Sequence, residues 1–220
     1  MDKIAVIAGT FVDTKMGVDI LTNDGFDAIG YPISNTPEEQ DKLQFLGVIE
    51  LENIVRQKIK DAKNKSIDKF LIYCNSLSAT LDFKRISELE EVKIVTPFDA
   101  YRKIAPKLDV LMLLSANSRS TMKQEELLKS INSKIKFVSV GALPIVNLIE
   151  EKIDPRDIVN NYGLVELIEF YEKLQILGDK SIILGCTHFP YIKEALREVV
   201  EDIEIIDPKD LMISIIKGEI

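Results

Sequence analysis

Short apolar runs rich in β-branched residues alternate with amphipathic segments from one end of this chain to the other. Repeated alternation of strand and helix is typical of α/β folds with mainly parallel sheets, because parallel strands need long crossover connections. We therefore predict an α/β fold, and 220 residues suffice for one large domain or two small lobes. Strands are expected at Ile4–Ala8, Asp27–Ser34, Phe70–Tyr73, Val92–Thr96, Val110–Leu114, Ile135–Val140, Ser181–Leu184 and Ile203–Ile206.

Helical patterns fill most of the segments between these strands. After the first strand we expect a polar loop and then a helix-like stretch from Met16. The longest predicted helix extends from Pro37 to about Lys63. Thr36 is suited to its N-cap, Pro37 to its first position and Glu39 to a capping box.

Both cysteines of the chain follow predicted strands, and ligands of α/β folds bind at the carboxyl ends of strands. Phe70–Thr80 (FLIYCNSLSAT) and Ser181–Pro190 (SIILGCTHFP) each pass from apolar strand to cysteine, polar capping residues and helix. A buried cysteine often only fills space. At a helix start, however, the dipole favours a thiolate, and the nearby N–H groups can bind a carboxylate.

These two properties suit the racemisation of an amino acid, which requires a held carboxylate and a base near the Cα proton. A single base could invert the centre only by moving across the substrate. Two thiols on opposite faces avoid this movement, since one removes the proton and the other delivers a new one. We therefore predict that Cys74 and Cys186 are the acid/base pair.

Composition excludes several other classes of protein. Two cysteines and one histidine cannot supply four Cys/His zinc ligands, and a disulfide scaffold is not expected. We predict no metal, although binding through carboxylates stays possible without a motif behind it. We also predict no cofactor, because no motif for a pyridoxal Schiff-base lysine is present. The net charge of −8, with both signs mixed, argues against nucleic acid as a partner. No apolar run is long enough to span a membrane, and no signal peptide is recognised, so a cytoplasmic protein is expected.

The cysteine segments resemble those of a known family. Cys74–Ala79 (CNSLSA) is similar to the first cysteine motif of glutamate racemases, CNTASA, and Gly185–Pro190 (GCTHFP) to their second, GCTHYP. The separation of the two cysteines also fits. The chain is thus identified as a member of the aspartate/glutamate racemase superfamily, most similar to glutamate racemase.

Further segments match in the same order, so the resemblance covers nearly the whole chain. Ala142–Glu150 (ALPIVNLIE) is similar to the family's CPLFVPLVE, and Ile205–Asp207 matches its final strand. The hydroxyls of a T-x-x-T-x-x-S loop are kept at Ser115, Ser118 and Thr121.

Two segments near the substrate depart from the family pattern. Asp13–Gly17 (DTKMG) looks like a shortened DSGxGG in which Lys15 and Met16 replace glycine, so its backbone is less free. Pro32–Ser34 (PIS) stands where the family usually has Pro-Tyr-Gly. Both changes affect the substrate side rather than the cysteines.

The resemblance implies two similar α/β lobes with mainly parallel sheets and an active site in the cleft between them. The first lobe would comprise residues 1–97 with 207–220 returning to it, and the second residues 98–206. Asp13 and His188 would assist the two thiols, and Glu150 would support His188. A homodimer is left open.

The same resemblance implies a small acidic amino acid as substrate. Polar side chains would hold its α-carboxylate and amine, and these candidate substrate-binding residues are Thr14, Ser34, Asn75, Ser76, Ser115, Ser118, Thr121 and Thr187.

Without the resemblance, each assisting residue has an ordinary alternative role. His188 is the chain's only histidine and follows Cys186 by two residues, but histidines also serve as caps. Asp13 alone would form an Asx-turn. Glu150 alone would be a solvated charge at a helix end, and Ser115–Thr121 could simply cap a helix that begins near Thr121.

Three functional hypotheses follow. The first is a cofactor-independent racemase of glutamate or aspartate. The second is another reaction on the same scaffold, such as hydantoin racemisation, cis–trans isomerisation of a diacid or decarboxylation, although a one-base decarboxylation would not need both cysteines. The third is a protein that binds an amino acid without turnover, which would show binding but no exchange of the Cα proton.

Overall fold

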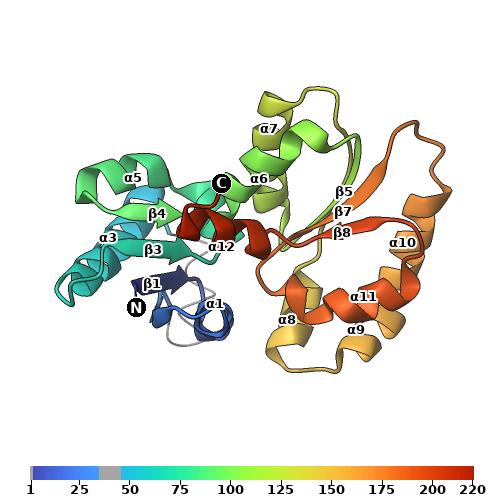
Figure 1. Ribbon diagram of the computed structural model, residues 1–220. Helices are drawn as coiled ribbons and strands as arrows, with labels where there is room; N and C mark the ends of the chain where they lie inside the picture. Colours follow the sequence, from blue (N-terminus) through green and yellow to red (C-terminus); the bar gives the residue numbers. More distant parts are fainter. Residues whose placement is uncertain (1, 35–45) are drawn as a thin grey trace. The chain divides into compact units, whose positions relative to one another are not determined.

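The computed structural model describes residues 2–34 and 46–220. Two compact units make up the chain, one formed by Met1–Asp99 with Leu211–Ile220 and the other by Ala100–Asp210. The second unit is therefore a continuous segment, whereas the first is built from two separate stretches of chain. Each unit has its own parallel sheet (Figure 1).

The sheet of the first unit has the strand order β2-β1-β3-β4, and every pair is parallel. Its central strand β1 (Lys3–Ala8) is fully buried from Ile4 to Ala8, which explains the unbroken apolar run in the sequence. The other strands are β2 (Asp27–Pro32), β3 (Lys69–Ile72) and β4 (Lys93–Val95).

The sheet of the second unit repeats this order as β6-β5-β7-β8, again with parallel pairs throughout. Its strands are β5 (Val110–Ser115), β6 (Lys136–Gly141), β7 (Lys180–Gly185) and β8 (Glu204–Ile206). Each of the eight predicted apolar runs thus contains a strand, and the α/β fold class with two parallel sheets is confirmed.

Helices connect the strands of both units. The first unit contains α1 (Phe11–Asn23), α3 (Val48–Lys63), α4 (Asn75–Thr80) and α5 (Phe83–Glu90), and α6 (Pro97–Ile104) leads into the second. The second unit contains η1 (Ala105–Lys107), α7 (Ser118–Ile131), α8 (Leu143–Glu150), α9 (Pro155–Asn161), α10 (Leu164–Lys173), η2 (Phe189–Ile192) and α11 (Lys193–Val199). Figure 1 shows α7 on one face of the second sheet and α8, α9 and α11 on the other.

Helix α3 confirms the later part of the long helix that was predicted from Pro37. Its buried residues Leu51, Val55, Ile59 and Ala62 lie one turn apart, so they form one apolar stripe along the helix. The predicted start, with Thr36, Pro37 and Glu39, lies outside the described residues.

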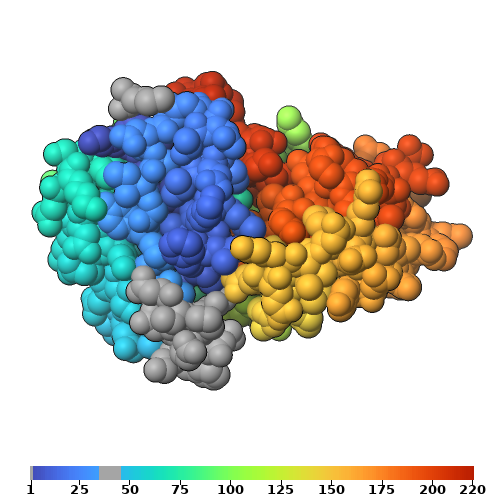
Figure 2. Space-filling model, turned by 90° about the horizontal axis from the view of Figure 1, so that it is seen from below, coloured from blue at the N-terminus to red at the C-terminus, as the bar shows by residue number. Residues whose placement is uncertain are grey.

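The prediction that a helix begins at Met16 is wrong, because α1 begins at Phe11. Thr10 is its N-cap, and a capping box joins Thr10 to Asp13: each side chain bonds the other residue's backbone N–H. This box starts the helix five residues earlier than expected. Asp13 therefore belongs to the first turn of a helix rather than to a loop. Helix α1, drawn in blue, reaches the surface seen in Figure 2.

Gly17 lets α1 lie directly against the strand that leads to Cys74. A Cβ added at this glycine would come within 2.7 Å of a Val6 methyl carbon and 2.9 Å of the Tyr73 side chain. We expect Gly17→Val to lower the free energy of unfolding by about 1–3 kcal/mol through overpacking. Urea denaturation measures this loss. Gly47→Ser is the control, since an added Cβ at Gly47 meets no atom within 4 Å; equal losses in both variants would contradict the prediction.

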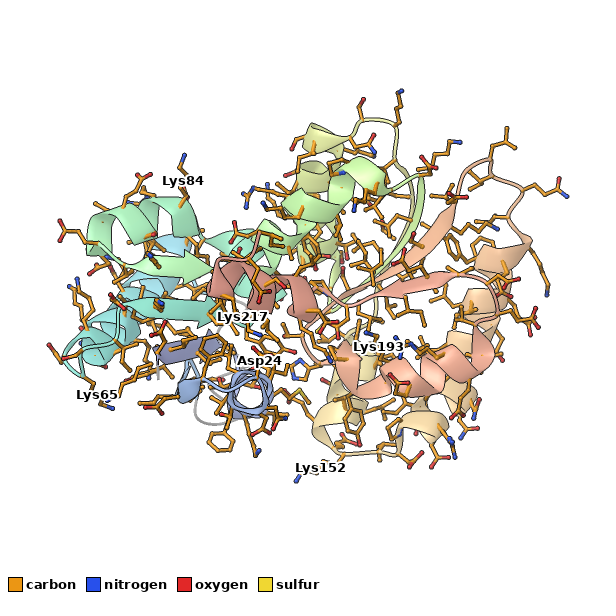
Figure 3. All side chains as sticks on the ribbon, in the orientation of Figure 1. Asp24, Lys65, Lys84, Lys152, Lys193 and Lys217 are labelled. Atoms are coloured by element: carbon orange, nitrogen blue, oxygen red, sulfur yellow. The ribbon has the colours of Figure 1, made fainter. Side chains whose placement is uncertain are left out.

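Helix α12 (Lys209–Lys217) carries the chain back into the first unit. Its Met212 is buried, and the ammonium of Lys217 lies 2.7 Å from the carboxylate of Asp24, just beyond α1 (Figure 3). Among residues 2–34 and 46–220, no helix combines the length and apolar character needed to cross a membrane.

Candidate active site

The strand order places one cysteine at the same position in each sheet. In the first sheet the chain runs from β1 to its neighbour β2 on one side and then crosses to β3 on the other side of β1. The second sheet repeats this with β5, β6 and β7, so the direction of the strand order reverses at β1 and at β5. Open parallel sheets bind ligands outside the carboxyl ends of the strands at such a reversal. Cys74 follows β3, the neighbour of β1, and Cys186 follows β7, the neighbour of β5.

Cys74 is the N-cap residue of the short helix α4, as the sequence predicted for a cysteine at a helix start. Its side chain is 9% exposed. The Tyr73 N–H donates to the Ile7 carbonyl and extends the strand pairing to the residue before the cysteine. The Ser78 hydroxyl and N–H both donate to the Cys74 carbonyl, at 2.8 and 3.1 Å, so the backbone at the thiol is held firmly.

Asp13 approaches the same place from β1 and α1. Its buried carboxylate accepts hydrogen bonds from the Gly9 N–H, the Thr10 N–H and the Thr10 hydroxyl at 3.2, 2.7 and 2.9 Å. A Cβ at Gly9 would lie 3.6 Å from the Cys74 sulfur and 3.7 Å from Asp13 Oδ2. Thiol and carboxylate therefore both border the one residue, Gly9, whose lack of a side chain leaves room between them.

The predicted substrate-binding residues of the first unit lie around this pair. Asn75 is buried in the first turn of α4, and Ser76 beside it is half-buried. The Ser34 hydroxyl donates to the Gly9 carbonyl at 2.6 Å, which fixes the end of β1. The Thr14 hydroxyl donates to the Thr10 carbonyl within α1, so both hydroxyls already donate to the backbone.

In the second unit, Cys186, His188 and Glu150 form a chain of contacts. The Cys186 sulfur, 5% exposed, lies 3.7 Å from Nδ1 of His188. Nε2 of the buried His188 lies 2.9 Å from Oε1 of Glu150, the last residue of α8. Glu150 is therefore no isolated surface charge. A carboxylate on one ring nitrogen favours the tautomer or charge state in which the imidazole can exchange a proton with the thiol.

The helix predicted after Cys186 and its capping residue Thr187 is not an α-helix at that point. A turn follows the cysteine, in which the Phe189 N–H bonds the Cys186 carbonyl at 3.1 Å, and the 3-10 helix η2 comes next. The α-helix α11 begins only at Lys193. The argument from a helix dipole therefore applies to Cys74 alone, and at Cys186 the neighbouring imidazole takes its place. Thr187, between Cys186 and His188, is buried.

The serine and threonine residues at and beyond the end of β5 have different surroundings. Helix α7 begins at Ser118 rather than near Thr121, because Asn117 is its N-cap and accepts from the Ser120 N–H. Ser118 is exposed, and the Thr121 hydroxyl donates to the Asn117 carbonyl at 2.8 Å. Ser115 is fully buried, and its hydroxyl donates to Gln124 Oε1 at 2.6 Å.

Sequence reasoning missed two residues near Cys186. Gln124 donates to the carbonyl of Gly185, the residue before the cysteine, at 2.9 Å. Tyr101 is fully buried, and its burial, together with the neighbouring charges of Cys186 and Asp207, raises the pKa of its hydroxyl well above the ordinary value. Tyr101 therefore stays protonated at neutral pH. No motif includes either residue, although Gln124 follows Thr121 by one helical turn.

Buried charge near Tyr101 is balanced by lysines. The buried carboxylate of Asp207 lies 3.2 Å from Nζ of Lys209 and 3.9 Å from Nζ of Lys193, which Figure 3 labels at the start of α11. Cys74 and Cys186 are not joined by a disulfide. Within residues 2–34 and 46–220, no three His, Cys, Asp or Glu side chains gather as metal ligands.

Comparison with known proteins shows similarity to glutamate racemases. No protein-family model matches the chain. It is 29% identical over 161 residues to a glutamate racemase of Hydrogenobaculum, covering 70% of this chain and 59% of that protein. The fold matches glutamate racemase of Francisella tularensis, solved with D-glutamate, at a TM-score of 0.71 and 19% identity, over 99% of this chain and 81% of the other. The chain is thus similar in sequence and in fold to glutamate racemases.

An aspartate racemase also has a similar fold. Aspartate racemase of Picrophilus torridus matches at a TM-score of 0.66 and 15% identity, over 100% of this chain and 94% of the other. The chain spans about three fifths of the length of the curated glutamate racemases that it matches.

Proposed function

We propose that this protein is a cofactor-independent amino-acid racemase for glutamate or aspartate, with Cys74 and Cys186 as its two acid/base groups. The observation that carries the proposal is the equivalent position of the two thiols. Each follows the third strand of a sheet with the same order. Cys74 borders the same glycine as Asp13, and Cys186 lies beside His188. A reaction that moves one proton off and another onto a single carbon needs such a pair.

The two thiols have different assistants in this proposal. Asp13 borders the Gly9 position together with Cys74, and His188 lies beside Cys186 with Glu150 behind it. A thiolate takes the Cα proton from one enantiomer, and the other thiol protonates the other face of the carbanion. In the reverse direction the roles exchange. The assistants hold or accept the proton that each thiol gains or loses.

The α-carboxylate and amine of the substrate would be held by polar groups next to the cysteines. Asn75 and Ser76 follow Cys74, and Thr187 follows Cys186. Glutamate and aspartate are favoured as substrates because the matched relatives are named glutamate racemases, and a similar fold is that of an aspartate racemase. Both thiols must stay reduced for this chemistry, so we place the reaction in the cytoplasm, where thiols are kept reduced.

Exchange of the Cα proton tests this function directly. The full chain is incubated in deuterated water with L- and D-glutamate, L- and D-aspartate and a panel of neutral amino acids. We expect deuterium at Cα and loss of optical activity for one of the acidic amino acids, without added cofactor or metal. Mass spectrometry and polarimetry measure the two effects in the same sample.

The double variant Cys74→Ser, Cys186→Ser is the matched control and should show neither effect. Exchange confined to neutral amino acids would reject the acidic substrate while leaving the two-thiol reaction in place. Saturable binding of an acidic amino acid without exchange would reject the racemase and favour a binding protein.

A further inference from the structure

A buried amide links the end of β5 to the residue before Cys186. The side chain of Gln124, 0% exposed, accepts a hydrogen bond from the Ser115 hydroxyl at 2.6 Å. Its Nε2 group donates to the carbonyl of Gly185 at 2.9 Å. Ser115 and Gly185 are the last residues of β5 and β7, and they are paired in the sheet register. Gln124 thus fastens two strand ends beside each other from α7.

The orientation of this amide is fixed by its partners. The Gly185 carbonyl can only accept a hydrogen bond, so the NH₂ group must face it and the amide oxygen must face Ser115. Rotating the amide by 180° would bring two oxygens together. A carboxylate at this position could accept from Ser115 but could not donate to Gly185. The site therefore requires a group with both a donor and an acceptor.

Glycine is the only residue type that fits at position 185, beneath the amide of Gln124. A Cβ at this position would lie 2.7 Å from Gln124 Oε1 and 2.8 Å from Ser115 Oγ, far inside contact distance. The absence of a side chain lets the amide close over the backbone directly before the cysteine. Beyond Gly185 the chain leaves the strand and enters the turn that carries Cys186 and His188.

We propose that Gln124 is a positioning residue for Cys186, which sets the direction of its thiol by holding the Gly185 carbonyl. This inference rests on the proposed function, because the expected effect on rate requires that the Cys186 thiol transfers a proton. This role requires no contact between Gln124 and a reacting atom. Releasing the carbonyl would let the Cys186 turn shift, and a shift of about 1 Å in a reacting group costs about 10²-fold in rate.

The test compares three variants on the same helix. Gln124→Met keeps the side-chain length but removes both polar groups, and Gln124→Glu keeps the acceptor only. Asn132→Leu is the matched control, since Asn132 at the end of α7 also donates its amide N–H groups to backbone carbonyls, those of Ala105 and Leu108 at 3.1 and 2.9 Å. The thermal midpoint of each variant is measured alongside to confirm that it is folded.

For Gln124→Met we expect kcat to fall about 10²-fold with KM within twofold, and for Asn132→Leu we expect kcat within twofold of the wild type. For Gln124→Glu the activity relative to wild type should rise as the pH falls, because a protonated carboxyl can again donate to Gly185. A purely structural role would lower all readouts of the Gln124 and Asn132 variants together.

A second readout does not depend on activity. Alkylation by iodoacetamide is followed at each cysteine by mass spectrometry, with Cys74 as the internal reference. We expect Gln124→Met to speed labelling of Cys186 at least threefold relative to Cys74, because the buried thiol is released. An unchanged ratio in a folded Gln124→Met variant would overturn the inference. A changed ratio in a protein that fails to racemise any amino acid would support the positioning role and reject only the proposed reaction.

Discussion

Cys74→Ser and Cys186→Ser should each nearly abolish racemisation, lowering its rate by roughly 10³-fold or more. A hydroxyl is far too weakly acidic to act as a base near neutral pH, whereas a thiol ionises close to that range. The serine is nearly the same size, so folding should be unaffected. Polarimetry with the preferred enantiomeric pair measures the loss. Because the two enantiomers have equal free energies in water, the final equilibrium cannot shift.

Deuterium exchange in the same two variants separates the tasks of the thiols. The remaining cysteine can still remove a proton from one enantiomer and return a deuteron to the same face. Cys74→Ser and Cys186→Ser should therefore each exchange only one enantiomer, and the two variants should exchange opposite ones. A single-serine variant that racemises at a rate near wild type would show that one thiol suffices and would reject the two-thiol proposal.

The second largest effect is expected for His188→Asn, which should lower kcat about 10²–10⁴-fold, the range for an acid/base assistant. Asparagine keeps a polar group near the position of Nδ1, which lies 3.7 Å from the Cys186 sulfur, but it cannot carry a proton to or from that sulfur. Exchange should fall most for the enantiomer that Cys186 deprotonates, as identified with Cys74→Ser.

Glu150→Gln provides the graded comparison for His188→Asn. The amide keeps a hydrogen bond to Nε2 but removes the negative charge, so its effect should be smaller than that of removing the imidazole. If both variants keep wild-type kcat, the contact chain from Cys186 to Glu150 serves folding rather than proton transfer.

The strands could be predicted because their sequence signal is local. β1 and β5 are buried along almost their whole length, so each appears as an unbroken apolar run. Helix starts were harder to predict. The capping box of Thr10 and Asp13 precedes a segment, Asp13–Gly17, that resembles a glycine-rich loop, so the sequence predicts a later helix start. After Cys186 the polar residues suggested a helix, but i to i+3 hydrogen bonds close a turn there instead.

The site residues divide in the same way. Cys74, Cys186 and His188 lie in short motifs and could be found in the sequence. Glu150 precedes His188 by 38 residues. The resemblance of Ala142–Glu150 to a family segment predicts their contact, whereas the residues alone do not, because the packing of α8 brings the carboxylate to the imidazole. Gln124 is linked to Gly185 across 61 residues. Contacts of this kind depend on the sheet register and on which face of a helix packs against the sheet. No local sequence pattern specifies either.

The return of α12 to the first unit has a consequence for the order in which the chain folds during synthesis. Ala100–Asp210 is one continuous stretch, so its core can close as soon as that stretch has left the ribosome. The first unit emerges earlier but lacks Met212 and the Lys217 partner of Asp24 until Leu211–Ile220 is made. The first unit, which contains Cys74, therefore begins to be translated before the second unit but is completed after it.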